Sequence, residues 1–153
     1  MQRTKVLIFL AAFVASAALG YLLFKGGSAL SLGGAVEVDW RLLGELDYIT
    51  GKAPSELETL DGQLVRIPGF MVPLEDNMRS VAEFLLVPSP QACIHVPPPP
   101  PNQMVLVEMP SGKEVEVQWG PIWIYGKLNL KSKRHLYGET SFTMVGERVE
   151  SYK

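Results

Sequence analysis

The single cysteine of this chain is followed two positions later by a histidine, in the segment Cys93-Ile94-His95. In an extended segment, side chains two positions apart point to the same side, so both could reach one ion. Thiolate and imidazole groups are ligands that zinc and copper(I) prefer. The spacing therefore predicts a metal site that needs further ligands from elsewhere in the chain.

Zinc is the predicted metal, with copper as the alternative. The candidate further ligands are Glu75, Asp76 and His135, joined by Met71 or Met104 if the metal is copper. Two other interpretations of Cys93 remain open. It could be a small buried side chain beside a histidine that bonds the backbone, or a redox thiol, although no second cysteine is present to resolve a disulfide.

Five consecutive prolines follow this pair. Proline fixes φ and lacks a backbone donor, so the run is predicted to form a rigid polyproline II segment. Such a segment could dock into an aromatic-lined groove of a partner protein. The candidate partner-binding residues are Pro97, Pro98, Pro99, Pro100 and Pro101. Alternatively, the run packs against the chain's own aromatic side chains, with Trp119, Trp123 and Tyr125 as the platform.

The elements that must position these residues are predicted to be short strands. A chain of 153 residues corresponds to one domain. The expected strands cover residues 64–72, 82–87, 104–109, 114–119, 122–130 and 141–149. The fourth alternates Val115, Val117 and Trp119 with polar residues, which predicts one buried face. Lys131 to Gly138 is expected to be an exposed basic loop that is either solvated or in contact with acidic lipid headgroups or a partner.

The predicted fold is mostly β: a small OB-like antiparallel barrel of five or six strands with a short N-terminal helix. A small β-sandwich is the alternative. Asp39 is expected to cap the helix through Leu46, and residues 54–60 form a second short helix or turn. Pro68-Gly69 predicts an edge or a bulge where the first strand bends. The predicted barrel interior consists of Val65, Ile67, Phe84, Leu86, Val105, Val107, Val115, Val117, Leu128 and Phe142.

The N-terminus is predicted to direct the chain out of the cytoplasm. Val6 to Phe24 contains nineteen residues without a charge, and Arg3 and Lys5 precede it. Residues 1–25 are therefore interpreted as a signal anchor or a cleaved signal peptide, residues 26–35 as a linker, and residues 36–153 as the barrel domain. The expected location is periplasmic, either anchored to the inner membrane or secreted after cleavage.

Charge and motif content exclude several functions. Beyond the leader, eleven basic residues face sixteen acidic ones, so nucleic acid is not expected as a partner. The chain lacks a phosphate-binding loop, a Gly-x-Ser-x-Gly elbow, a His-Glu-x-x-His motif and a Cys-x-x-Cys motif. No enzymatic activity is therefore predicted.

Several short motifs carry a family resemblance. They are Asp61-Gly62-Gln63, the segments 69–75 (GFMVPLE) and 84–88 (FLLVP), the Cys93-to-Gln103 run and Tyr125-Gly126-Lys127-Leu128. With these motifs the chain resembles an uncharacterised bacterial envelope family, number 3299 among the domains of unknown function. The resemblance implies an exported or anchored protein, often encoded beside ABC transporter components and a histidine-rich periplasmic protein linked to zinc uptake.

Two functional hypotheses follow from the sequence. The first is an extracytoplasmic accessory protein of a zinc uptake system that binds or passes metal near an ABC transporter or a periplasmic metal-binding protein. The second is a metal-free interaction module of a bacterial envelope complex. The N-terminal helix would tether either one to the membrane.

Overall fold

The computed structural model describes residues 34–75, 79–90 and 98–152. The chain divides into Met1–Gly33 and Gly34–Lys153, and all described residues belong to the second unit. The predicted leader lies outside the described residues. Within the described part, no helix is both long enough and apolar enough to cross a membrane.

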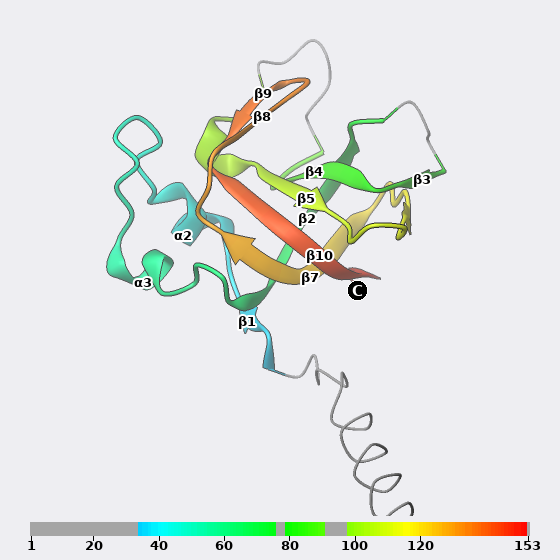
Figure 1. Cartoon of the computed structure of the whole chain (residues 1–153), viewed down its shortest axis with the longest axis horizontal. Coiled ribbons are helices and arrows are strands. Elements are labelled where there is room, and N and C mark those ends of the chain that lie inside the picture. Colours follow the sequence, from blue (N-terminus) through cyan, green and yellow to red (C-terminus); the bar gives the residue numbers. More distant parts are fainter. Residues whose placement is uncertain (1–33, 76–78, 91–97, 153) are drawn as a thin grey trace, which may run out of the picture. The chain divides into compact units, whose positions relative to one another are not determined.

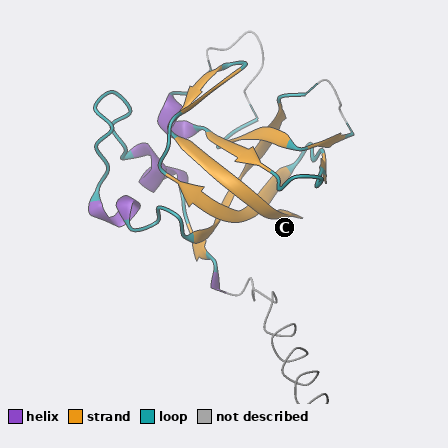
Figure 2. Cartoon of the chain, viewed as in Figure 1, coloured by secondary structure: helices purple, strands orange, loops and turns teal. Residues whose placement is uncertain are grey.

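Short strands dominate the described residues, as Figure 2 shows. The strands are β1 (Val36–Glu37), β2 (Leu64–Pro73), β3 (Ser80–Val81), β4 (Glu83–Val87), β5 (Val105–Glu108), β6 (Val115–Glu116), β7 (Pro121–Asn129), β8 (Lys133–His135), β9 (Gly138–Thr140) and β10 (Phe142–Ser151). The helices are α2 (Trp40–Gly44), α3 (Ser55–Glu58) and the 3-10 helix η2 (Pro101–Gln103).

Five of these strands close into a barrel in the order β2-β4-β5-β10-β7, with β7 pairing back to β2 (Figure 1). This closed arrangement confirms the predicted small OB-like barrel. One difference is that β5 and β10 pair in parallel, whereas the other four neighbouring pairs are antiparallel. A closed ring with an odd number of strands cannot alternate direction throughout, so a five-stranded barrel requires at least one parallel pair.

Strand β2 is long because it serves two neighbours. Residues 64–70 pair with β7, and residues 70–73 pair with β4. The two ranges meet at Phe70, and at the preceding Gly69 an added Cβ would lie only 2.8 Å from the carbonyl oxygen of Val87. The predicted interruption at Pro68-Gly69 is therefore a partner change within one continuous strand, and it requires a residue without a side chain.

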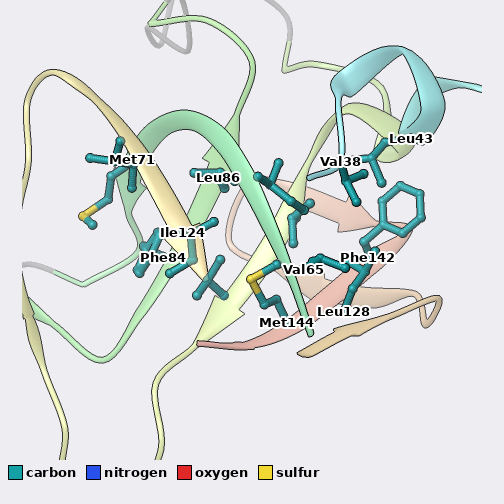
Figure 3. Close-up of a cluster of buried hydrophobic side chains, with 14 of the residues drawn as sticks. Val38, Leu43, Val65, Met71, Phe84, Leu86, Ile124, Leu128, Phe142 and Met144 are labelled. Carbon is teal, nitrogen blue, oxygen red and sulfur yellow. The ribbon is translucent and has the colours of Figure 1, made fainter. Parts of the chain in front are cut away.

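The barrel interior is apolar (Figure 3). Phe84 and Phe142 are its largest fully buried side chains. The predicted interior residues that are buried in this core are Val65, Ile67, Phe84, Leu86, Val105, Val107, Val117, Leu128 and Phe142. Val115 is partly buried against the same cluster. Alternation with period two therefore identified the interior of the barrel.

Helix α2 begins where the sequence predicted. The Asp39 side chain accepts a hydrogen bond from the backbone N–H of Leu42 at 2.8 Å, which satisfies a free donor of the first turn. The helix buries Leu43, and the following helix α3 buries Leu57 in the same core. The two helices lie together beside one part of the barrel (Figure 1).

Two local predictions are wrong. The alternation from Val115 to Trp119 does not continue as a strand, because β6 contains only Val115 and Glu116, and the Trp119 side chain is 73% exposed. Gly120 follows at once, and Pro121 begins β7. The predicted basic loop from Lys131 to Gly138 contains strand β8, which forms a hairpin with β9.

Candidate functional site

The structure tests the predicted metal site only in part. Cys93, His95 and Asp76 lie outside the described residues. Among the residues that are described, no group of three or more His, Cys, Asp or Glu side chains could hold a metal ion. The alternative copper ligands Met71 and Met104 are both buried among apolar side chains.

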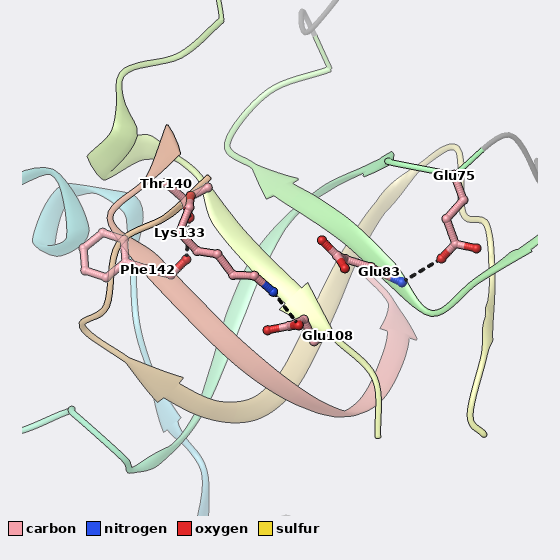
Figure 4. A network of polar contacts seen from close by, with 6 residues as sticks. All are labelled: Glu75, Glu83, Glu108, Lys133, Thr140 and Phe142. Atoms are coloured by element: carbon pink, nitrogen blue, oxygen red, sulfur yellow. Dashed lines mark hydrogen bonds and ion pairs between the residues drawn. The ribbon is translucent and has the colours of Figure 1, made fainter. Parts of the chain in front are cut away.

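The Glu75 side chain forms hydrogen bonds that stabilise the fold. Its Oε1 accepts a hydrogen bond from the backbone N–H of Ala82 at 2.9 Å. It accepts a second one from the backbone N–H of Glu83 at 3.1 Å (Figure 4). The carboxylate therefore ties the end of β2 to the start of β4. A metal at Glu75 would either displace these bonds from Oε1 or bind through Oε2.

His135 is held in one tautomer on strand β8. Its Nδ1 accepts a hydrogen bond from the backbone N–H of Tyr137 at 3.2 Å, so the proton of the neutral ring is on Nε2. Burial lowers the pKa of His135, which favours this neutral form. Nε2 is buried, and it has no hydrogen-bond partner in the described part of the chain. Binding a metal through Nε2 would require the ring to lose its Nε2 proton.

A lysine fastens the β8–β9 hairpin to the barrel. Lys133 Nζ lies 2.6 Å from Glu108 Oε1 (Figure 4), and Glu108 pairs with Glu83 across β5 and β4. The hydrogen bond to Glu108 raises the pKa of Lys133, with a smaller contribution from the charge of Glu83. The cation thus offsets the repulsion between two carboxylates that face each other on neighbouring strands.

The end of the proline run clamps helix α2. The Asn102 side-chain amide donates hydrogen bonds to the carbonyl oxygens of Gly44 and Leu46, both at 2.9 Å. The Gln103 side-chain amide donates to the carbonyl oxygen of Trp40 at 3.0 Å. The Gly44 and Leu46 carbonyls lie at and just after the C-terminal end of α2, where carbonyls lack intrahelical partners, whereas Trp40 is the first residue of the helix. The Asn-Gln part of the motif is therefore structural.

The prolines are fixed by the same clamp. The Pro101 carbonyl accepts a hydrogen bond from Ser141 N–H at 2.9 Å, and η2 lies against α2 and β9. Pro98 and Pro100 are exposed, whereas Pro99 and Pro101 are half-buried. Pro97 lies outside the described residues.

The predicted aromatic platform for the prolines is wrong with respect to Trp119, which is largely exposed. The other two aromatic side chains of that platform face arginines instead. Arg66 lies over the Trp123 ring at 4.8 Å from its centroid, and Arg148 lies over the Tyr125 ring at 4.4 Å.

These aromatic side chains line a groove that the sequence analysis missed. An open hollow of about 550 Å³ on the outer face of β2, β7 and β10 is lined by Arg66, Trp123, Tyr125, Glu150 and Ser151. The strand register explains the grouping, because Arg66 and Arg148 pair with Tyr125 from opposite sides, and Glu150 pairs with Trp123. The sequence did contain a sign of this groove: Trp123 and Tyr125, and likewise Arg148 and Glu150, are two positions apart and so point to the same side of their strand. The sequence could not show that these two strands are neighbours.

The charges along the groove are linked in one network. Arg66 lies 2.6 Å from Glu37, and its pKa is raised by hydrogen bonds to Tyr125 and then Glu37. The Tyr125 hydroxyl donates to Glu150 at 3.1 Å, and Arg148 lies 3.0 Å from the other Glu150 oxygen. Two arginines therefore balance two glutamates.

The outer face of β4 and β5 is different, because it is apolar and buried. Leu85, Val87 and Leu106 point away from the barrel interior, yet they are only 2%, 1% and 0% exposed. Met104 belongs to the same cluster, and Phe70, Val72 and Leu74 pack against it. The chain thus has a second, smaller core outside the barrel.

The comparisons with known proteins agree on one family. A crystal structure of a DUF3299 family protein from Pseudomonas aeruginosa PAO1 is similar, with a TM-score of 0.60 and 27% identity. The similarity covers 78% of this chain and 97% of that chain. No curated protein matches the chain. The family model described as protein of unknown function DUF3299 matches residues 49–151, so the chain belongs to the DUF3299 family.

Proposed function

We propose that this protein is a non-enzymatic, extracytoplasmic binding module that presents its proline segment to a partner protein of the bacterial envelope. The observation that carries the proposal is the clamp at the end of that segment. Asn102 and Gln103 hold the chain to α2 through side-chain hydrogen bonds, while Pro98 and Pro100 remain exposed.

Such a clamp favours binding because it holds the proline segment in its extended conformation before a partner binds. Pro100 has φ −62° and ψ 157°, which is polyproline II geometry. A segment that is already extended loses little conformational entropy when it docks, and aromatic-lined grooves recognise this shape. The proposed partner is therefore an envelope protein with an aromatic groove, such as a component of an ABC transporter.

Site-specific crosslinking of the full chain in cells tests this proposal. A photoreactive amino acid at Pro100 should crosslink to one envelope protein, and mass spectrometry of the product identifies it. The same amino acid at Ser111, which is also exposed, provides the matched control in the turn after β5. Asn102→Ala should weaken the Pro100 crosslink, because it removes the two hydrogen bonds from Asn102 to the Gly44 and Leu46 carbonyls.

The expected pattern has three parts: a crosslink from Pro100, none to the same protein from Ser111, and a weaker one in the Asn102→Ala background. Crosslinks from Pro100 that form only within the chain would overturn the proposal. A crosslink of equal strength from both positions would also overturn it, because the contact would not depend on the prolines.

Zinc handling is the second candidate, because Cys93 and His95 precede the clamped prolines by only a few residues. In this role the protein would hold or pass zinc near a transporter. Calorimetric titration of zinc into the full chain should show binding that Cys93→Ser with His95→Ala abolishes. His135→Gln should leave binding unchanged if the tautomer fixed by Tyr137 keeps that ring out of the site. Equal binding by the wild-type chain and the double variant would exclude Cys93 and His95.

A further inference from the structure

The groove on the outer face of β2, β7 and β10 is separate from the proline segment. We infer that it is a binding site for a neutral, hydroxyl-rich saccharide. Its charge balance, its hydrogen-bonding groups and its aromatic rim support this ligand class.

Charge balance argues against an anionic ligand. Each arginine at the groove already has a carboxylate partner: Arg66 pairs with Glu37, and Arg148 pairs with Glu150. Phosphate groups and nucleic acids are bound by cations that are free to neutralise them. A ligand without formal charge fits this balanced network better.

The same network offers many hydrogen bonds at fixed positions. A guanidinium presents five donors and a carboxylate four acceptor positions, so a paired arginine and glutamate retain unused capacity for adjacent hydroxyl groups. Arg148 Nε is buried and has no hydrogen-bond partner among the described residues. Arg66, Arg148 and Glu150 are carried by strands of the closed barrel, which keeps their geometry rigid.

Aromatic side chains form one rim of the groove. The rings of Trp123 and Tyr152 lie 5.1 Å apart with an interplanar angle of 31°. Tyr152 is 48% exposed, so part of its apolar surface is open to a ligand. Aromatic rings of this kind combine apolar contact area with a polar end, which suits the apolar faces and polar edges of sugar rings.

A peptide chain is less suited to this face. Extended peptides commonly bind by adding a strand to an open sheet edge. Here β7 pairs with β2 on one side and β10 on the other, and β10 also pairs with β5. The backbone of β7, the central strand of this face, is therefore paired on both sides, and that of β10 is paired on both sides from Phe142 to Val145.

Titration with neutral oligosaccharides tests the inference. The isotope-labelled full chain is kept in a detergent without a sugar headgroup, and amide and indole shifts are followed during addition of maltotetraose, cellotetraose or the N-acetylglucosamine tetramer. In a second arm, the chain is cosedimented with insoluble cell-wall glycan. The two arms distinguish a soluble sugar from a polymer as the source of the same chemistry. Shifts are expected at Trp123 and along β10.

Matched variants locate the binding. Tyr152→Ala and the conservative Glu150→Gln should each weaken it about fivefold to tenfold, through loss of an aromatic contact and of a charged hydrogen-bond partner. Tyr137→Ala is the control, because Tyr137 is 45% exposed, close to the 48% of Tyr152, but it follows strand β8. Thermal unfolding verifies that each variant is folded.

Binding in either arm that depends on Tyr152 and Glu150 supports the inference. No interaction with any neutral saccharide in either arm would overturn it. Equal weakening by Tyr137→Ala, or binding of only anionic ligands such as inorganic phosphate or an acidic peptide, would also overturn it.

Discussion

Strand β2 contributes to two outer faces of the barrel that have opposite character. In its first half, the outward-pointing Arg66 joins the polar and aromatic groove over β7 and β10. In its second half, Phe70 and Val72 pack against the buried apolar cluster over β4 and β5. The two faces lie on one continuous strand and are separated by the partner change near Gly69.

The difference shows where this barrel can bind a ligand. OB-folds commonly bind ligands on the face of their second and third strands, which are β4 and β5 here. In this chain, the outward side chains Leu85 and Leu106 of those strands are already buried. The open face with unused hydrogen-bonding capacity is the other one. A function inferred from OB-folds in general would therefore be assigned to the wrong face.

The largest predicted effect concerns the apolar face. Leu106→Ala should lower the free energy of unfolding by about 2–5 kcal/mol, because it removes a fully buried side chain and leaves a cavity. Equilibrium unfolding in urea, followed by tryptophan fluorescence, measures the change. The result would establish that this outer surface acts as a second core.

Leu136→Ala is the matched control for this prediction, because the same substitution is made at a leucine that is 76% exposed. Its effect should be within about 0.5 kcal/mol, as for other surface substitutions. Similar losses for both variants would mean that the two leucines do not differ in burial as the structure indicates.

A smaller effect is predicted for the polar face. A double-mutant cycle with Arg148→Met and Glu150→Gln should give a coupling energy of about 0.5–1 kcal/mol that falls as salt is added. The pair is partly shielded, since its side chains are 41% and 42% exposed. The measurement compares unfolding free energies at low and high ionic strength.

The pair of Arg41 and Asp39 provides the contrast. Its atoms lie 3.9 Å apart, and the side chains are 85% and 61% exposed, so no measurable coupling is expected. Equal coupling in the two pairs would remove the argument that the groove network is held rigidly.

The barrel could be predicted from the sequence because the alternation of apolar and polar residues along a strand can be seen within a few neighbouring residues. Residues such as Val65 and Ile67 alternate with outward residues, and their burial was confirmed. The signal failed at Trp119, where the same period continued in sequence after the strand had ended. Periodicity reports which residues share a side of a strand, and it does not report where pairing stops.

The two outer faces could not be predicted in this way, because they are formed by residues that are far apart in the sequence. The groove exists because Arg66, Tyr125 and Arg148 are aligned by the pairing of three strands, and that register is set by the closed barrel. The role of Asn102 depended on a contact with Leu46, far away in the sequence. The motif containing Asn102 is one of those that carry the family resemblance, but its spacing alone could not show that Asn102 and Gln103 hold the two ends of a helix.

The smallest predicted effect is a dependence on pH at His135, in the hairpin that Lys133 fastens to the apolar face. Burial lowers the pKa of His135 below its ordinary value of 6.5, so the unfolded chain takes up the proton first as the pH falls. Stability should therefore decrease as the pH drops below about 6.5, and the decrease should level off below the folded pKa.

The variant His135→Gln lacks this titrating group. The free energies of unfolding of the wild-type chain and the variant are measured in urea from pH 7.5 to 5.5. The wild type should lose stability relative to the variant as the pH falls, because contributions from carboxylates and from His95 are present in both chains and cancel in the difference. A difference that is constant with pH would show that His135 is as solvated in the folded chain as in the unfolded one.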